Sequence, residues 1–281
     1  MYFEGAMKIG GKRLSEMNPV FYALAEKKEN IRKSLKDQFS TTKFAESLVE
    51  ERLPVVISSH ESGLIKRGKG IDVTLQENKA VNIRLACACL NGLLIRPGEV
   101  FSFWRLVGNP SPARGYKNGR VIIGNQLRPG PGGGLCNLAN LIHWMVIHSP
   151  LEVVEFHNHS DALAPDEHGR VPFSAGTSVS YSFVDYRFRN NTDQDIQLLT
   201  WCDGDKLYGE LRCTEGFPWF YRMVEEGHHF HKEGDKYYRI SKIYKETTDR
   251  RTGEVIRKDL ILDNHSEVMF DYSLIPPEQI R

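Results

Sequence analysis

The sequence lacks any apolar run of the roughly 20 residues that a membrane-spanning helix needs. It also lacks an excess of charge of one sign, since 37 basic residues stand against 36 acidic ones and the formal net charge is +1. Such a balance gives no field that would attract nucleic acid or an acidic membrane surface. We therefore expect neither a membrane span nor a nucleic-acid partner.

Cofactor motifs are absent as well. The chain contains no P-loop, no Rossmann fingerprint, and neither the H-E-x-x-H nor the G-x-S-x-G signature. Three histidines stand together at His228, His229 and His231 in what reads as a polar loop, but no cysteine or further histidine nearby completes a tetrahedral set of ligands. We therefore expect neither a cofactor nor a metal site.

Cysteine is scarce, with five residues in a chain of 281. An odd number of cysteines in a chain of this length is typical of free thiols in a reducing compartment, and not of a disulfide framework. Residues 1–7 also lack the charged and then apolar layout of a secretory signal. These features favour a cytoplasmic location.

Helical periodicity is strongest in three parts of the chain. Apolar residues at helical spacing predict one or two helices within residues 12–44 and a further helix over residues 78–94. A third helix, over residues 138–148, has the apolar face of a buried helix and follows a glycine-rich turn.

Strand patterns fill most of the remaining sequence. Alternating β-branched and aromatic residues predict a strand or extended loop at residues 99–104 and a strand at 151–156. Turn residues at 190–193 and 203–205 predict an antiparallel meander over 178–212, and those at 250–253 predict a further hairpin. The predicted fold class is therefore α+β, with N-terminal helices, a central helix after the glycine-rich turn, and a mainly antiparallel sheet.

The order of these elements suggests three parts. Residues 1–69 form an N-terminal helical segment, residues 70–215 form the core, and residues 216–281 form a C-terminal β-hairpin extension packed on the core. We expect one main domain with a smaller appendage.

The glycine-rich turn carries the most distinctive chemistry. Residues 129–136 read Pro-Gly-Pro-Gly-Gly-Gly-Leu-Cys, so Cys136 lies at the start of the helix that follows. Exposed backbone N–H groups and the helix dipole favour a thiolate at that position, which is typical of an activated nucleophile. The alternative is a glycine-rich corner that is capped by a buried structural cysteine.

A nucleophilic cysteine needs a general base, and two histidines follow the strand predicted at residues 151–156. His157 and His159 lie on the same side of an extended chain, so either of them is a candidate base. His143 lies seven residues beyond Cys136, about 10 Å further along the helix axis, which is too far for direct proton transfer. Alternatively, His157 and His159 are ordinary exposed histidines.

Four ordered motifs give the chain a resemblance to a known family. Residues 90–99, 101–104, 132–136 and 184–193 resemble the VanW family, and the likeness extends over about residues 70–212. The resemblance implies a role in cell-wall biology, with a peptidoglycan-type peptide or its precursor as the partner. Some long, exported members are credited with L,D-transpeptidase activity, in which a cysteine attacks an acyl donor.

The cysteine of that activity maps onto Cys136. Two positions depart from the family pattern, because Asn137 stands where a glutamine usually follows the cysteine, and Gly176 stands where the family's G-x-D-A-T-V stretch has an aspartate.

Two hypotheses of function follow. In the first, Cys136 is the nucleophile of an acyl-transfer or amide-hydrolysis reaction on cell-wall peptides, and His157 or His159 is its base. In the second, the chain is a non-catalytic accessory protein whose glycine-rich turn shapes a pocket for a cell-wall precursor or partner protein. The residues expected to contact the ligand are Gly132, Gly133, Gly134 and Asn137.

Overall fold

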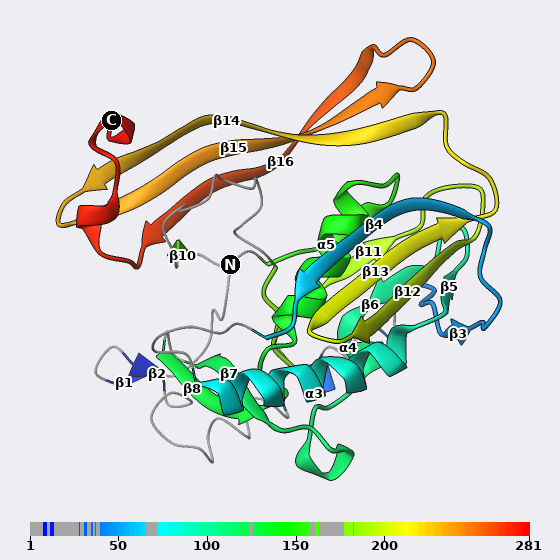
Figure 1. Cartoon of the computed structure of the whole chain (residues 1–281), viewed down its shortest axis with the longest axis horizontal. Coiled ribbons are helices and arrows are strands. Elements are labelled where there is room, and N and C mark those ends of the chain that lie inside the picture. The colour runs from blue at the N-terminus through cyan, green and yellow to red at the C-terminus, as the bar shows by residue number, and fades with distance from the viewer. Residues whose placement is uncertain are drawn as a thin grey trace.

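A computed structural model of the chain has the expected α+β fold, with mostly antiparallel sheets around a few helices (Figure 1). None of the described helices is long and apolar enough to cross a membrane. The described residues are 8–9, 12–13, 28, 31–32, 35, 37, 40–65, 72–123, 126–157, 161–162, 177–181 and 183–281.

The N-terminal part is described only in pieces. Residues 28, 31, 32, 35 and 37 are helical, in keeping with the expected N-terminal helices. The short strands β1 (Lys8–Ile9) and β2 (Lys12–Arg13) form an antiparallel pair.

The helix α3 (Val73–Leu90) is the longest in the described chain. It begins earlier than predicted, because the side chain of Asp72 accepts a hydrogen bond from the backbone N–H of Leu75 and caps the first turn. It also ends earlier, because Leu93–Ile95 forms the strand β5. Residues at helical spacing bury one face of the helix in the main core: Ala80, Ile83, Ala86, Cys87 and Leu90.

A five-stranded sheet forms the centre of the molecule, in the order β3-β5-β12-β13-β4. The helix α3 packs on β12, while α5 (Cys136–Ile147) packs on β4 and β13. The turn predicted at residues 203–205 joins β12 to β13. The strands not yet given are β3 (Ser47–Leu48), β4 (Val55–Gly63), β12 (Ile196–Asp203) and β13 (Lys206–Cys213).

A three-stranded sheet, in the order β6-β11-β9, lies beside this core. Only the first half of the strand predicted at 99–104 is extended, because the side chain of Ser102 caps the short helix α4 (Phe103–Val107). Of the meander predicted over 178–212, only the hairpin of β12 and β13 holds, since residues 187–189 pair with β6 and β9 in this other sheet, and Ser180 and Val184 pair across a turn. The strands are β6 (Val100–Ser102), β9 (Glu152–Glu155) and β11 (Arg187–Arg189), and the hairpin β7 (Asn118–Ile123) and β8 (Gln126–Pro131) leads into the glycine-rich turn.

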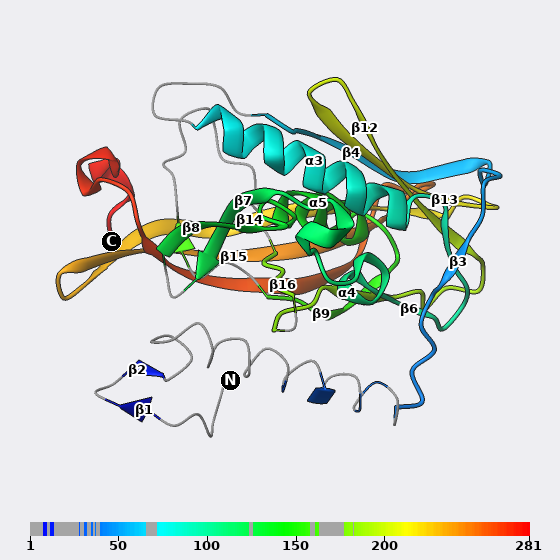
Figure 2. The same ribbon diagram turned by 90° about the horizontal axis from the view of Figure 1, so that it is seen from below.

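The C-terminal part has three long strands where the sequence predicted two. The expected hairpin is β15 (Lys236–Asp249) with β16 (Val255–Val268), and β14 (Trp219–Glu233) pairs along the other edge of β15. The expectation of a polar loop at His228–His231 was therefore wrong, because these residues lie within β14. Figure 2 shows α5 between α3 and this sheet, whose fourth strand is β10 (Asp161–Ala162).

Candidate functional site

The glycine-rich turn is tightly packed against the hairpin that precedes it. Gly132 and Gly134 have φ angles of 72° and 94°, a region in which only glycine is unstrained. A Cβ atom added at Gly133 would lie 2.1 Å from the carbonyl carbon of Gly119 on β7. Packing therefore accounts for these glycines, and their contact with a ligand stays a prediction.

A buried asparagine holds the turn to α3. The side-chain amide of Asn82 donates to the carbonyl oxygens of Gly133 and Lys117, both at 3.0 Å. Its oxygen accepts a hydrogen bond from the backbone N–H of Lys117 at 2.7 Å. These three bonds satisfy the buried amide and join α3, β7 and the turn into one unit.

Cys136 is the first residue of α5, as expected, and its side chain is partly buried against the main core. Its Sγ atom lies 3.6 Å from the carbonyl oxygen of Val179, to which the thiol donates. Burial raises the pKa of the Cys136 thiol. The direction is opposite to the one expected from the helix N-terminus, because the loss of solvent around the sulfur outweighs the backbone hydrogen bonds at Val179 and Cys136, which lower the pKa.

Asn137 is engaged within the protein. Its side-chain oxygen accepts a hydrogen bond from the hydroxyl of Ser62, and its amide nitrogen donates to the carbonyl oxygen of Gly63, both at 3.1 Å. The side chain therefore ties the start of α5 to the end of β4. A contact of Asn137 with a ligand stays a prediction.

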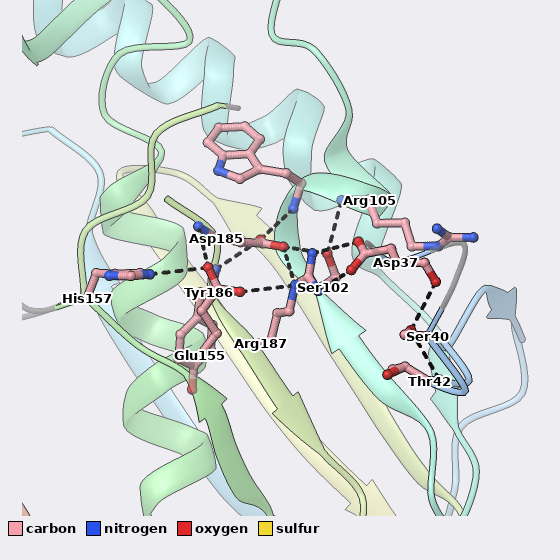
Figure 3. A network of polar contacts seen from close by, with 11 residues as sticks. Asp37, Ser40, Thr42, Ser102, Arg105, Glu155, His157, Asp185, Tyr186 and Arg187 are labelled. Carbon is pink, nitrogen blue, oxygen red and sulfur yellow. Dashed lines mark hydrogen bonds and ion pairs between the residues drawn. The ribbon is translucent and has the colours of Figure 1, made fainter. Parts of the chain in front are cut away.

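His157 lies at the end of β9 with its ring turned toward a carboxylate (Figure 3). Its Nε2 atom is 3.2 Å from Oε1 of Glu155. Burial lowers the pKa of His157, although the charge of Asp185 opposes this shift. The carbonyl of His157 accepts from the N–H of Ser178, the residue before the one that binds the Cys136 thiol. The backbone of His157 is thus connected to the Cys136 thiol through residues 178 and 179 and their two hydrogen bonds.

The imidazole partner expected for Cys136 is not found in the part of the chain that the structure describes. There, the recorded hydrogen bond of the thiol is to the Val179 carbonyl. His159 lies outside the described residues. The choice between His157 and His159 as a base stays a prediction.

His143 has a structural position inside the core. Its Nδ1 atom is 3.1 Å from the hydroxyl of Tyr186, and its ring stacks on Phe156 with the centroids 4.6 Å apart. Burial lowers the pKa of His143 to about 3, so the ring is neutral near pH 7.

A buried carboxylate connects two of the family-like motifs (Figure 3). Oδ2 of Asp185 accepts from the hydroxyl of Ser102 at 2.6 Å and from Nε of Arg187 at 2.8 Å. Its Oδ1 accepts from the backbone N–H of Trp104 at 3.1 Å. Residues 101–104 and 184–188, far apart in sequence, therefore meet at one charged and fully hydrogen-bonded centre.

Arg187 extends this centre toward the N-terminal part of the chain. Its two terminal nitrogens each lie 2.8 Å from a different oxygen of Asp37, and its Nε lies 3.4 Å from Oε2 of Glu155. Burial opposes the charged form, but the hydrogen bonds to Asp37 and Asp185 raise the pKa of Arg187. Sequence reasoning missed this cluster, although an acid and a base two residues apart on an otherwise apolar strand were a usable signal.

An open groove of about 1440 Å³ lies beside the contact of α5 and β9 with the C-terminal sheet, and residues 191–195 and 214–218 line its other side. Aromatic side chains line it, and Lys245 on β15 reaches the end of α5, where its Nζ donates to the carbonyl of Ser149 at 2.5 Å. Burial lowers the pKa of Lys245 to about 8. A large groove with aromatic walls and a few polar groups is a typical place for a ligand. Its aromatic lining residues are Phe156, Phe217, Trp219 and Tyr221.

Metal ligation has little support in the described residues, where no group of three or more histidine, cysteine, aspartate or glutamate side chains could hold an ion. All five cysteines carry free thiols, as expected from their number.

Comparison with known proteins gives the chain its relatives. The family described as VanW like protein matches residues 78–212. The Vancomycin B-type resistance protein VanW of Enterococcus faecalis is 28% identical over 259 residues, which cover 92% of this chain and 94% of the relative. No solved structure matches the chain.

A second relative matches in part. The uncharacterized protein YoaR of Bacillus subtilis is 28% identical over 122 residues, which cover 43% of this chain and 39% of the relative. The matched family region contains the glycine-rich turn, Cys136 and the cluster of Asp185 and Arg187. Residues 78–212 therefore belong to the VanW family, and the likeness to its Enterococcus faecalis member runs along nearly the whole chain.

Proposed function

We propose that this chain acts in vancomycin resistance as a non-catalytic protein that binds a peptidoglycan-type peptide or its precursor. The relative that is named for vancomycin B-type resistance supports the biological setting, since the alignment covers 92% of this chain. A cytoplasmic location, which the free thiols favour, would bring the protein together with precursors rather than with the mature wall.

The state of Cys136 is the observation that carries the non-catalytic proposal. A cysteine nucleophile acts as a thiolate, and it needs a low pKa or an adjacent base. The Cys136 thiol instead donates to the Val179 carbonyl, and burial raises its pKa. The net effect of burial is to stabilise the neutral thiol.

A second candidate function is acyl transfer by Cys136. The pairing of His157 with Glu155 favours it, because a carboxylate that orients an imidazole is the usual support of a general base. In this reaction the thiolate would attack the carbonyl carbon of an amide, and the amine would leave with a proton from the imidazole. A second amine or water would then release the acyl group from sulfur.

Two measurements separate these functions. We expect that the protein, when incubated with D-Ala-terminated pentapeptide and with tetrapeptide cell-wall fragments, binds a fragment in calorimetry but forms no covalent adduct in intact-mass spectra. The Cys136→Ser variant should bind equally well. An adduct on the wild type that is missing from Cys136→Ser would overturn the non-catalytic proposal in favour of acyl transfer.

Alkylation tests the thiol directly. The hydrogen bond from Cys87 lowers the pKa of the partly buried Cys202, whereas burial raises that of Cys136. Limited iodoacetamide treatment near pH 7.5, read by peptide mass spectrometry, should therefore label Cys202 before Cys136. Faster labelling of Cys136 would indicate an activated nucleophile.

A further inference from the structure

The outer edge of the Arg187 guanidinium holds a carboxylate in the end-on, two-bond geometry with which arginine recognises free carboxylates. The carboxylate belongs to Asp37, which lies 150 residues earlier in the chain. We propose that this edge of Arg187 is the binding site for the terminal carboxylate of a peptide ligand, and that Asp37 occupies it from within the same chain. Only the cell-wall identity of the peptide rests on the proposed function.

Arg187 is fixed in place from behind. Its Nε donates to Asp185, and Asp185 is itself held by the hydroxyl of Ser102 and the backbone N–H of Trp104. The direction of the guanidinium is therefore set without any contribution from Asp37. A recognition side chain that is held by a second shell of hydrogen bonds is what a specific ligand site requires.

The charges of the cluster make Asp37 the replaceable member. Asp185 is 2% exposed and bonded on both oxygens, and Glu155 bonds His157 and the backbone N–H of Asp185, so both carboxylates have partners besides Arg187. These two carboxylates already compensate Arg187, and Asp37 adds a third negative charge. Exchange of Asp37 for the carboxylate of a ligand would leave the charge of the site unchanged.

The chain near Asp37 allows such an exchange without loss of the core. Anchoring begins close by, where the backbone N–H of Ala45 donates to the carbonyl of Val100 and β3 pairs with β5. The hydroxyl of Ser40 bonds the carbonyl of Asp37, which is a contact between near neighbours in the chain and not one with the core (Figure 3).

The ring of Phe44 supports the same site. The Arg187 guanidinium lies 5.3 Å from the centre of this ring, and the Arg105 guanidinium lies 4.7 Å from it. Arg105 is half-exposed and pairs with the exposed Glu46. A second cation therefore stands beside the carboxylate site, and it favours an anionic ligand group.

Calorimetric titration of the full chain tests the site with three probes: N-acetyl-D-alanine, a pentapeptide ending in D-Ala-D-Ala, and the same pentapeptide with a C-terminal amide. We expect Asp37→Ala and the closer isostere Asp37→Asn to bind the two carboxylate probes at least tenfold more tightly than the wild type. The amide should bind at least tenfold more weakly than the free acid. Adding Arg187→Lys to Asp37→Ala should abolish the gain, because lysine keeps the charge but lacks the two-bond fork.

The matched control is Asp263→Asn, which removes an exposed carboxylate that pairs with Lys242 on the C-terminal sheet and leaves Arg187, Asp37 and Arg105 intact; it should leave all three affinities unchanged. If neither carboxylate probe binds more tightly to the Asp37 variants, or if acid and amide bind alike, the site is disproved. Tighter binding of N-acetyl-D-alanine without binding of the pentapeptide would support the site and refute the cell-wall proposal. Equal binding of the pentapeptide to wild type and variants would support the cell-wall proposal and refute the site at Arg187.

Discussion

Burial decides the protonation of two side chains on one helix, α5. Cys136 at its start and His143 in its second turn both lose solvent, and in both cases the neutral form is favoured. For the thiol this means a raised pKa, and for the imidazole a lowered one. In both positions the surroundings that folding supplies disfavour the charged form of the side chain.

His143 should make the protein less stable in mild acid. Its pKa falls from 6.5 in the unfolded chain to about 3 in the fold, so below pH 6.5 the unfolded state binds a proton that the folded state does not. Its contribution is present above pH 6.5 and is lost as the pH falls toward 3. Between pH 7.5 and 5 the loss should be about 2 kcal/mol.

Urea unfolding of wild type and His143→Gln over this pH range measures the effect, because other titrating groups are common to both proteins and cancel in the difference. The exposed His231→Gln serves as the control and should follow the wild type. A His143→Gln variant with the full pH dependence of the wild type would contradict the assignment.

Among the elements, the glycine-rich turn is a junction. It receives the hairpin of β7 and β8, it is held to α3 by Asn82, and it starts α5 at Cys136. Gly133 faces Gly119 so closely that neither position has room for a side chain. The turn therefore sets how three elements meet, whatever else it does.

Gly133→Ala should lower the free energy of unfolding by about 3 kcal/mol or more, since the new methyl group would overlap backbone that cannot move without shifting β7. Gly63→Ala is the matched control, because nothing lies within 4 Å of its added Cβ and its φ is not positive. Chemical unfolding of both variants checks the prediction. A Gly133→Ala protein as stable as Gly63→Ala would show that the turn is not tightly packed in solution.

On the scale of the whole molecule, the C-terminal sheet is attached to the core through α5. Ile243 on β15 packs on Ile147 at the end of that helix, together with Trp144, Val153, Met223, Ile261 and Leu262. Lys245 adds a cation at the helix C-terminus, where the dipole favours it. The boundary predicted near residue 216 stays a prediction, but this contact is where the two parts would separate.

Ile243→Ala should lower the free energy of unfolding by about 2–5 kcal/mol, because it opens a cavity at a side chain that is 1% exposed. Hydrogen exchange should accelerate in β14, β15 and β16 and stay slow in α3. Val255→Ala, at a position that is 50% exposed on β16, should change little. Equal acceleration in α3 and in the sheet would show that the molecule unfolds as one unit.

Local sequence determined much of this protein. Helical spacing placed α5 to within two residues, turn residues placed the hairpins at 203–205 and 250–253, and the order of the motifs indicated the VanW family. These features depend on periodicity and on the backbone preferences of neighbouring residues, so a single segment is enough to show them.

Tertiary structure alone decided the rest. The strand β14 was hidden because many of its residues are polar, and Phe230 within it is buried by a cluster with Val268 and Ile275, which come from distant parts of the sequence. The pKa of Cys136 and the pairing of Arg187 with Asp37 depend on segments up to 150 residues away. The charge and the partner of a side chain are set by desolvation and by the groups that folding brings to it, and neither is written in the local pattern of residues.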